Sequence, residues 1–324
     1  MQIIKINNIS DFDNFGFFDS DIKRKCVTVL GFFDGVHLAH RKLILKAKEL
    51  AKKKNIPLTV FTFSSDESGL KRNTSRLFTD KEKLDVFQRL NADTVLLVSF
   101  PAVSELSKEE FVRSILVEKL NTDTAVCGYN FSFGKGGVGR SEDLSAIMKK
   151  LGRDAFVLPE YTYNSLPVSS SLIRDTLRDK KLYEASLLLG EPYSITGTVS
   201  HGLGVGKKLG IPTVNLPLPS SRFSLPVGVY AGVLSVDGKI FLALANIGNC
   251  PTIKERETHL EAFILDFDGN LYGKEIKIYF LEYLREEKKF KSIEDLLLQI
   301  NVDKKRALEL IKEKKWQEIG PNLQ

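Results

Sequence analysis

The chain lacks the features that mark disulfide-rich, zinc-bearing and membrane-spanning proteins. Its three cysteines, Cys26, Cys127 and Cys250, are widely separated and have no CxxC or Cys/His ligand spacing. An odd, scattered set of thiols argues against a disulfide framework and against a structural zinc site. No apolar run reaches the roughly 18 residues that a membrane span needs, and Met1–Phe18 interleaves Asp and Asn with apolar residues. We therefore expect a cytoplasmic protein that does not bind membranes.

The chain also lacks a strong charge imbalance. It has 47 basic and 41 acidic residues, and the net charge of +6 is spread along the sequence. Basic runs such as 52–54 and 312–315 end amphipathic stretches, so we interpret them as solvated helix faces and expect no nucleic-acid partner. A hydrophobic share of 43% in 324 residues is ordinary for a globular protein, and at roughly 100–200 residues per domain it favours two domains.

The first half alternates short apolar runs with amphipathic stretches. Between the first two runs, one helical face is predicted to carry Leu43, Ile44, Ala47, Leu50 and Ala51. Strand and helix in repeated order predict an α/β domain, a Rossmann-like parallel sheet covered by helices on both faces. Such sheets bind ligands beyond the carboxyl ends of their strands. The predicted strands are Cys26–Phe32, Pro57–Phe63, Asp93–Ser99, Thr124–Gly128 and Asp154–Leu158.

The second half changes character after two short helical patterns, Ser169–Arg178 and Lys181–Leu189. Short β-rich runs and the hairpin signals Asp237-Gly238 and Asp268-Gly269 predict a small antiparallel β-barrel. A terminal helix is predicted with Ser292 as its cap and an apolar stripe of Ile293, Leu296, Leu297 and Ile300. We place the domains at residues 1–188 and 189–324. The predicted barrel strands are Ser194–Ser200, Gly228–Val236, Ile240–Ile247, Glu261–Phe267 and Glu275–Phe280.

One motif follows the first predicted strand and opens a helix. It reads GFFDGVHLAH from Gly31 to His40, with His37 and His40 three residues apart on one helical face. Backbone N–H groups and the positive helix end at such a site favour phosphate. The stretch resembles the HxGH signature of nucleotidyltransferases, in the form found in prokaryotic FMN adenylyltransferases.

Two later segments match the same family in order. GYNFSFG at Gly128–Gly134 resembles its GxNFxFG motif, and Val168–Arg174 resembles its SSTxIR motif. The resemblance implies transfer of AMP from ATP to the phosphate of FMN, with release of pyrophosphate and with Mg²⁺ bridging the phosphates. The residues that it assigns to this site are His37, His40 and Arg174 as catalytic groups and Gly31, Phe33, Asp34, Asn130, Ser170 and Ser171 as ATP contacts.

Two departures from this pattern lie in the same domain. The family usually has Gly where this chain has Ala39, and it commonly has Pro-His-Pro where this chain continues after Phe63 with Ser64-Ser65-Asp66-Glu67. These changes motivate an alternative in which the first domain has lost adenylyl transfer.

A glycine-rich segment, Gly197–Asn215, begins the barrel. Its glycines allow the backbone to approach phosphates, while Thr213 and Asn215 fall on one face of an extended chain and offer oxygens to magnesium. The segment resembles the riboflavin kinase signature with its PTAN core, and Asn246–Thr252, Leu271–Lys274 and Leu284–Phe290 match further family segments. The resemblance implies that Gly202, Gly206 and Gly210 contact ATP and that Thr213 and Asn215 are metal ligands.

The same resemblance points to a catalytic glutamate five residues before an aspartate. Glu261 fits that register to Asp266, whereas its rival Glu257 lies nine residues before Asp266. Phosphorylating the riboflavin hydroxyl needs a group that takes its proton, and we assign this role to Glu261.

Taken together, the motifs are similar to one family, the bifunctional riboflavin kinases/FMN adenylyltransferases. The expected substrates and products are riboflavin, FMN, FAD and ATP, with Mg²⁺ as cofactor, in a monomer or weak homo-oligomer. The alternatives are a riboflavin kinase with a degenerate first domain, which would make FMN without FAD, and a non-catalytic flavin-binding module, which would bind ligand without consuming ATP.

Overall fold

The computed structural model of the chain describes residues 1–13, 25–64, 75–200, 213–219, 221–249, 258–265, 267, 269–313 and 316. The chain folds into two compact units. One unit comprises Met1–Asn73 with Phe78–Val168, and the other comprises Thr74–Leu77 with Ser169–Gln324. The domain boundary between residues 188 and 189 stays a prediction.

The first unit is built on a parallel six-stranded sheet in the order β1-β4-β3-β2-β5-β8. The five strands predicted here are confirmed within two residues, and β1 is an edge strand that the sequence reading missed. From β2 the chain builds outward through β3 and β4 on one side, and β5 and β8 follow on the other. This reversal between β2 and β5 is the place where such sheets bind ligands. The strands are β1 (Gln2–Ile6), β2 (Cys26–Leu30), β3 (Leu58–Phe63), β4 (Thr94–Val98), β5 (Thr122–Gly128) and β8 (Asp154–Leu158).

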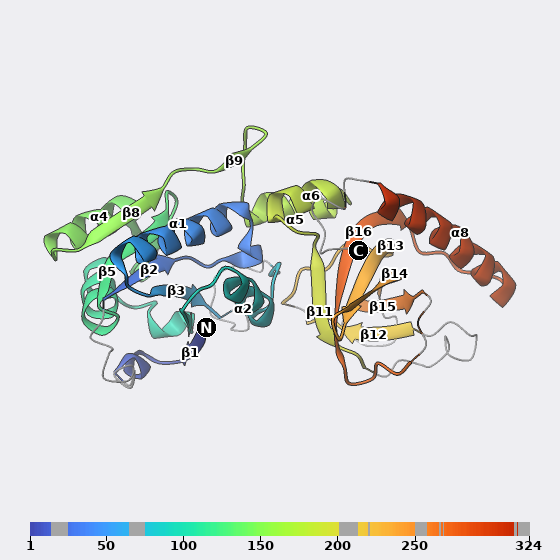
Figure 1. The fold of residues 1–324 in the computed structure, drawn as a ribbon, viewed down its shortest axis with the longest axis horizontal. Helices are drawn as coiled ribbons and strands as arrows, with labels where there is room; N and C mark the ends of the chain where they lie inside the picture. Colours follow the sequence, from blue (N-terminus) through green and yellow to red (C-terminus); the bar gives the residue numbers. More distant parts are fainter. Residues whose placement is uncertain are drawn as a thin grey trace. The chain divides into compact units, whose positions relative to one another are not determined.

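Helices cover the sheet of the first unit (Figure 1). Helix α1 (Leu38–Lys54) packs on β2, β3 and β5, and its predicted apolar face is buried except for half-buried Leu50. The other helical segments of this unit are α2 (Asp80–Arg89), α3 (Lys108–Glu110), the π-helix Phe111–Lys119 and α4 (Ser141–Lys150). Two short hairpins complete it, β6 (Ser132–Phe133) with β7 (Gly139–Arg140) and β9 (Thr162–Tyr163) with β10 (Leu166–Pro167).

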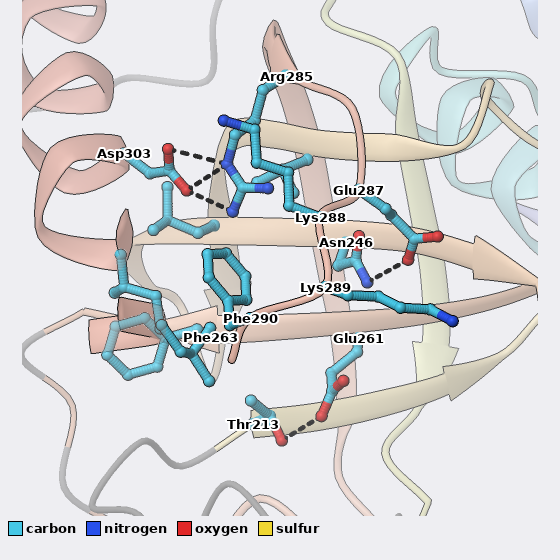
Figure 2. Close-up of a pocket in the computed structure, with 14 residues that line it drawn as sticks. Thr213, Asn246, Glu261, Phe263, Arg285, Glu287, Lys288, Lys289, Phe290 and Asp303 are labelled. Atoms are coloured by element: carbon cyan, nitrogen blue, oxygen red, sulfur yellow. Dashed lines mark hydrogen bonds and ion pairs between the residues drawn. The ribbon is translucent and has the colours of Figure 1, made fainter. Parts of the chain in front are cut away.

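The second unit contains an antiparallel sheet in the order β11-β16-β13-β14-β15-β12. A bridge between Ser200 and Asn215 joins its two ends, so the barrel is nearly closed. Asp237 (φ 49°) and Gly238 (φ 74°) form the predicted hairpin turn, whereas Asp268 lies outside the described residues. The strands are β11 (Ser194–Thr198), β12 (Thr213–Pro217), β13 (Gly228–Val236), β14 (Lys239–Asn249), β15 (Thr258–Ile264) and β16 (Glu275–Arg285). Figure 2 shows the side of the barrel where Glu261 of β15 and Asn246 of β14 project together.

Among the described residues, three helices accompany the barrel: α5 (Ser170–Arg178), α6 (Leu182–Leu189) and α8 (Ile293–Lys312). Ser292 caps α8 as predicted, since its Oγ accepts a hydrogen bond from the backbone N–H of Asp295 at 3.1 Å. The predicted apolar stripe is wrong in part, because Ile293 and Leu297 are exposed. The helix packs instead through residues spaced at three and four from Leu296 onward, which are Leu296, Ile300, Asp303, Ala307 and Leu310.

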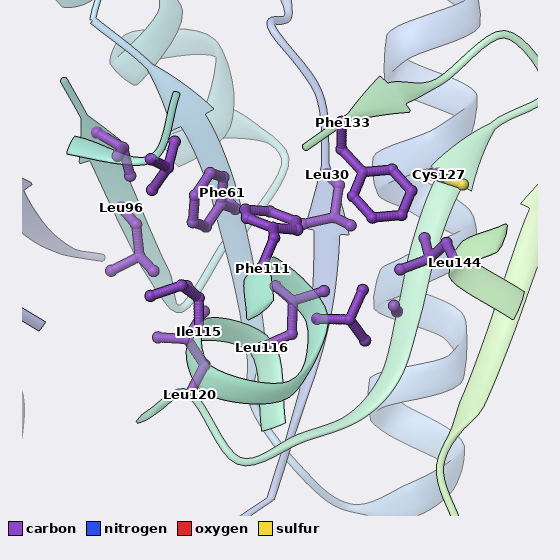
Figure 3. Packing of buried hydrophobic residues seen from close by; sticks show 14 of the residues in the cluster. Leu30, Phe61, Leu96, Phe111, Ile115, Leu116, Leu120, Cys127, Phe133 and Leu144 are labelled. Atoms are coloured by element: carbon purple, nitrogen blue, oxygen red, sulfur yellow. The ribbon is translucent and has the colours of Figure 1, made fainter. Parts of the chain in front are cut away.

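One hydrophobic core lies between the parallel sheet and two helices that cover it. Phe61, Leu30 and Leu96 project from neighbouring strands, and Phe111 of the π-helix packs on Phe61 with ring centroids 5.6 Å apart (Figure 3). At about 25 cal/mol per Å² of buried apolar surface, each such aromatic contributes a few kcal/mol. This core holds the strand ends in place, and the first candidate site is built on those ends.

Candidate active sites

The first site lies between β2 and β5, where the strand order of the parallel sheet reverses. The loop after β2 carries His37 and His40 at the start of α1, and the loop after β5 carries Asn130. Because β2 and β5 are parallel neighbours, both loops leave the same edge of the sheet. Asn130 is exposed there. The predicted motifs of this unit therefore share one edge, at the topological switch point.

The two histidines stack on each other. Their ring centroids are 3.6 Å apart with planes 17° from parallel, which confirms the predicted common face. Burial, reinforced by nearby Arg41, lowers the pKa of His37 from 6.5 to about 3. Burial, reinforced by His37, holds the pKa of His40 well below its ordinary value. Both imidazoles are thus neutral at pH 7, and each can donate one N–H hydrogen bond to a phosphate oxygen.

The backbone before the histidines is strained. Phe33 (φ 55°) and Val36 (φ 37°) adopt left-handed conformations, which cost on the order of 1–3 kcal/mol each for such residues. Phe33 is held there because its fully buried ring meets Phe87 and the edge of His40 at 5.6 and 5.2 Å between centroids. The Phe33 side chain thus packs against His40, and the contact of Phe33 with ATP stays a prediction.

Gly31 and Asp34 have roles in this same loop. A Cβ on Gly31 would lie 2.8 Å from Cζ of Phe33, so Gly31 makes room for that ring. Asp34 is buried, and its Oδ1 accepts a 3.4 Å hydrogen bond from the backbone N–H of Phe78. Both residues shape the loop, and their contact with ATP stays a prediction.

From Ser169 onward the third motif belongs to the second compact unit, and Ser170 to Arg174 lie on α5. Ser169 caps α5 by accepting a hydrogen bond from the N–H of Leu172 at 3.2 Å. Arg174 is buried and donates to Ser171 Oγ at 3.4 Å, and Ser170 stands in the first turn. These residues and the histidines thus belong to different compact units, and their common role stays a prediction.

The second site lies on three neighbouring strands of the barrel. Asn215 of β12 and Asn246 of β14 both lie directly opposite Glu261 of β15. Thr213 Oγ1 donates a 2.6 Å hydrogen bond to Glu261 Oε1. The register therefore gathers the predicted catalytic glutamate and the two predicted metal ligands.

A cavity of about 570 Å³ opens at this site. Its polar end carries Thr213, Glu261 and Asn246 together with the charged loop after β16, and its other end is apolar (Figure 2). The apolar walls come from Val229, Leu244, Phe263, Phe290, Leu296 and Ile300, and the remaining lining residues are Arg285, Glu287, Lys288, Lys289 and Asp303. A ligand with a flat aromatic ring attached to a polar chain would fit a cavity with one apolar and one polar end.

An ion pair between Arg285 and Asp303 stabilises one wall of the cavity. Arg285 donates from Nε and Nη2 to Asp303 Oδ2 at 3.0 and 2.8 Å, and Gln299 donates to Asp303 Oδ1 at 2.9 Å. The Arg285 and Asp303 side chains are only 15% and 5% exposed. The pair joins β16 to α8, so it sets the position of the helix that supplies Leu296 and Ile300.

Sequence reasoning assigned no role to Asn246, Arg285, Glu287 and Asp303. The first three fall within segments that resembled the riboflavin kinase family, which was the available signal, but Asp303 lies on α8 outside those segments. Gly202, Gly206, Gly210 and Glu257 lie outside the described residues.

The oxygen donors of the barrel site fit a hard divalent cation. Among the described residues, no group of three or more His, Cys, Asp or Glu side chains could hold a metal by itself. Magnesium commonly takes one or two protein oxygens and completes its shell with water and substrate phosphates. Thr213 and Asn215 would supply such oxygens, and the cation would neutralise charge on the phosphates of ATP.

The two sites together define an ATP-dependent transferase with one phosphate-binding edge in an α/β unit and one flavin-sized cavity in a β-barrel. The FAD synthetase family matches residues 19–172 and the riboflavin kinase family matches residues 189–311. The bifunctional riboflavin kinase/FMN adenylyltransferase of Bacillus subtilis is 35% identical over 88% of this chain and 92% of its own, and that of Escherichia coli K12 is 34% identical over 88% and 92%. The chain belongs to the bifunctional riboflavin kinase/FMN adenylyltransferase family.

A solved structure supports the fold of the whole chain. The crystal structure described as a macrolide-efflux protein from Streptococcus pneumoniae is 26% identical, has a TM-score of 0.81, and covers 95% of this chain and 99% of its own. Within the part of the chain that the structure describes, no helix is both long and apolar enough to span a membrane.

Proposed function

We propose that the barrel phosphorylates riboflavin and that the α/β unit adenylylates FMN, with the residues assigned below. The chain is a riboflavin kinase and an FMN adenylyltransferase. Both activities use ATP, and such enzymes generally need a divalent metal. The observation that carries the assignment is the Thr213–Glu261 hydrogen bond at the polar end of the cavity, with Asn215 directly opposite Glu261.

In the kinase step the 5′-hydroxyl of riboflavin attacks the γ-phosphorus of ATP and ADP leaves. The Glu261 carboxylate accepts the hydroxyl proton, and its hydrogen bond from Thr213 fixes its orientation. Thr213 and Asn215 would hold Mg²⁺, which would offset charge on the transferred phosphoryl group. The apolar end of the cavity takes the flavin ring, with Phe263 and Phe290 on its walls.

In the adenylylation step a phosphate oxygen of FMN attacks the α-phosphorus of ATP and pyrophosphate leaves. The nucleophile is already an anion, so this step needs positioning and charge stabilisation in place of a base. Neutral His37 and His40 donate hydrogen bonds to the phosphates, and Asn130 holds the nucleotides at the same sheet edge. Ser170, Ser171 and Arg174 bind the triphosphate, while Gly31, Phe33 and Asp34 shape the loop.

Chromatography of flavins after incubation with ATP and Mg²⁺ tests both assignments. Reactions start in parallel from riboflavin and from FMN, and FAD is expected from both. FMN alone would favour the degenerate first domain, and no product would favour the flavin-binding module. The same assay applied to Glu261→Gln tests the proposed proton acceptor. Glu184→Gln, an exposed change on α6 in the second unit, is its matched control.

Further expectations from the sequence stay proposals. We propose a cytoplasmic monomer or weak homo-oligomer that acts without nucleic-acid or membrane partners. Sedimentation at several protein concentrations tests the oligomeric state.

A further inference from the structure

Two lysine side chains of the kinase cavity have no anionic partner. The loop after β16 and the end of that strand supply three cations to the cavity lining, Arg285, Lys288 and Lys289. Arg285 is neutralised by Asp303. Within the part of the chain that the structure describes, the side chains of Lys288 and Lys289 form no hydrogen bond and no ion pair, and both residues are exposed. Such ammonium groups are available to an anionic ligand that enters the cavity.

The two lysines occupy different parts of the cavity wall. In Figure 2, Lys289 reaches across the polar end of the cavity above Glu261, and Thr213 lies below Glu261. Lys288 lies beside Arg285 in the same view. The proposed proton acceptor therefore has a hydroxyl group on one side and an ammonium group on the other.

The position of the transferred phosphoryl group follows from the proton acceptor. In the kinase step the 5′-oxygen of riboflavin bonds to the γ-phosphorus of ATP, the bond from that phosphorus to the ADP oxygen breaks, and ADP leaves with the electron pair. The hydroxyl proton goes to Glu261. A base takes a proton across about 2.6–3.2 Å, so the phosphorus bonded to that oxygen lies within about 5 Å of the Glu261 carboxylate. The phosphoryl group is thus at the polar end, where Lys289 lies.

The charge at this end of the cavity needs a cation from the protein. Glu261 and Glu287 place two carboxylates there, and they repel an incoming phosphate unless a positive charge offsets them. The phosphoryl group itself carries negative charge on three equatorial oxygens in the transition state. A lysine ammonium has three N–H donors, and its hydrogen bonds to phosphate oxygens are about twice as strong as those between neutral groups.

We propose that Lys289 is a catalytic residue of the riboflavin kinase site, whose ammonium group donates hydrogen bonds to the transferred phosphoryl group and stabilises its charge in the transition state. The inference rests on the proposed role of Glu261 as proton acceptor. Lys288 has the same charge and lies in the same loop but takes no part, so the two residues form a matched pair for experiment.

The test compares Lys289→Gln with Lys288→Gln in the full chain. Each variant removes one exposed positive charge from the same loop, so the change in net charge is equal. Initial rates of riboflavin phosphorylation, counted as FMN plus FAD formed, give kcat and the KM values for riboflavin and ATP. Lys289→Gln should lower kcat by about 10- to 100-fold with the KM for riboflavin unchanged. Lys288→Gln should change neither constant, and Lys289→Arg, which keeps the cation, should recover much of the lost rate.

A normal kcat in Lys289→Gln, or a raised KM for ATP with kcat unchanged, would overturn the proposal, because only an interaction made in the transition state lowers kcat. Equal losses in the two glutamine variants would also overturn it, since they would show a general effect of charge. Conversion of supplied FMN to FAD should keep its wild-type rate in both variants. A Glu261→Gln variant with the wild-type kinase rate would refute the proton-acceptor assignment, whereas a slow Glu261→Gln beside a normal Lys289→Gln would refute only the role of the lysine.

Discussion

The Arg285–Asp303 pair makes a sharp prediction for the stability of the barrel. Asp303→Ala removes the carboxylate that accepts three hydrogen bonds from Arg285 and one from Gln299. The guanidinium then stays at the cavity wall, where its side chain is only 15% exposed. Because α8 meets β16 through this pair, the helix that lines the cavity loses its fixed position.

The expected loss follows from the burial of both partners. Removing one member of a buried ion pair typically costs about 3–5 kcal/mol, and the partial exposure of Arg285 places this pair near the lower end, about 3 kcal/mol. For a unit of this size, each kcal/mol lowers the melting temperature by a few degrees, so a fall of roughly 10 °C is expected. The same helix offers a control in Arg306 and Glu309, whose side chains are 59% and 68% exposed. Glu309→Ala should cost less than about 1 kcal/mol.

Calorimetry of both variants measures the change in melting temperature. Two flavin assays, one started from riboflavin and one from FMN, show which of the two activities is lost. In Asp303→Ala, formation of FMN should fail at lower temperatures than in Glu309→Ala, whereas conversion of supplied FMN to FAD below the melting transition should be unchanged, because Arg285 and Asp303 line the kinase cavity and are not among the residues proposed for adenylylation. If Asp303→Ala and Glu309→Ala melt within a degree of each other, the pair does not hold α8 and the reasoning is wrong.

Three further predictions concern the chemistry and the pH dependence. Glu261→Gln should slow FMN formation by about 10²–10⁴-fold and leave FAD formation from FMN intact; loss of both in a folded variant would contradict separate sites. His40→Ala should lower FAD formation from FMN by about 10–100-fold, as for a lost hydrogen bond to a charged group, and unchanged synthesis would remove the histidine from the site. Since the pKa of His37 falls from 6.5 to about 3 on folding, the unfolded chain binds more protons below pH 6.5, so His37 alone should remove about 1.4 kcal/mol of stability from the first unit between pH 7.5 and 5.5, and His40 acts in the same direction. Urea titrations at both pH values would check this, and an equal loss in His37→Gln would show that other groups cause it.

In the α/β unit, most of the sheet strands and helix α1 could be predicted from the local hydrophobic pattern. Five of its sheet strands follow from apolar runs, and α1 follows from the spacing of Leu43, Ile44, Ala47 and Ala51. The edge strand β1 was missed because Gln2–Ile6 mixes polar and exposed residues with only Ile6 buried. An edge strand gains its structure from pairing with β4, which is a tertiary contact.

In the terminal helix α8, the local pattern did not predict which face is buried. Its cap at Ser292 is local and was predicted, but its apolar stripe was predicted only in part, since Leu296 and Ile300 pack whereas Ile293 and Leu297 are exposed. Ile293 and Leu297 are as apolar as Leu296 and Ile300, so composition does not decide which side packs. Contacts with the barrel decide it: Ala307 and Leu310 pack with Leu244, and Asp303 pairs with a residue that is 18 positions away.

By itself, the sequence determined the α/β and barrel architecture and the family, and it led to the proposal of His37, His40, Thr213, Asn215 and Glu261 as site residues, because these depend on local periodicity and short motifs. Only the tertiary structure decided that the histidines stack and stay neutral, that Asn246 faces Glu261, and that Arg285 ties α8 to the barrel. Strand register, burial and long-range ion pairs depend on free energies summed over distant residues, and no local pattern in the chain encodes them.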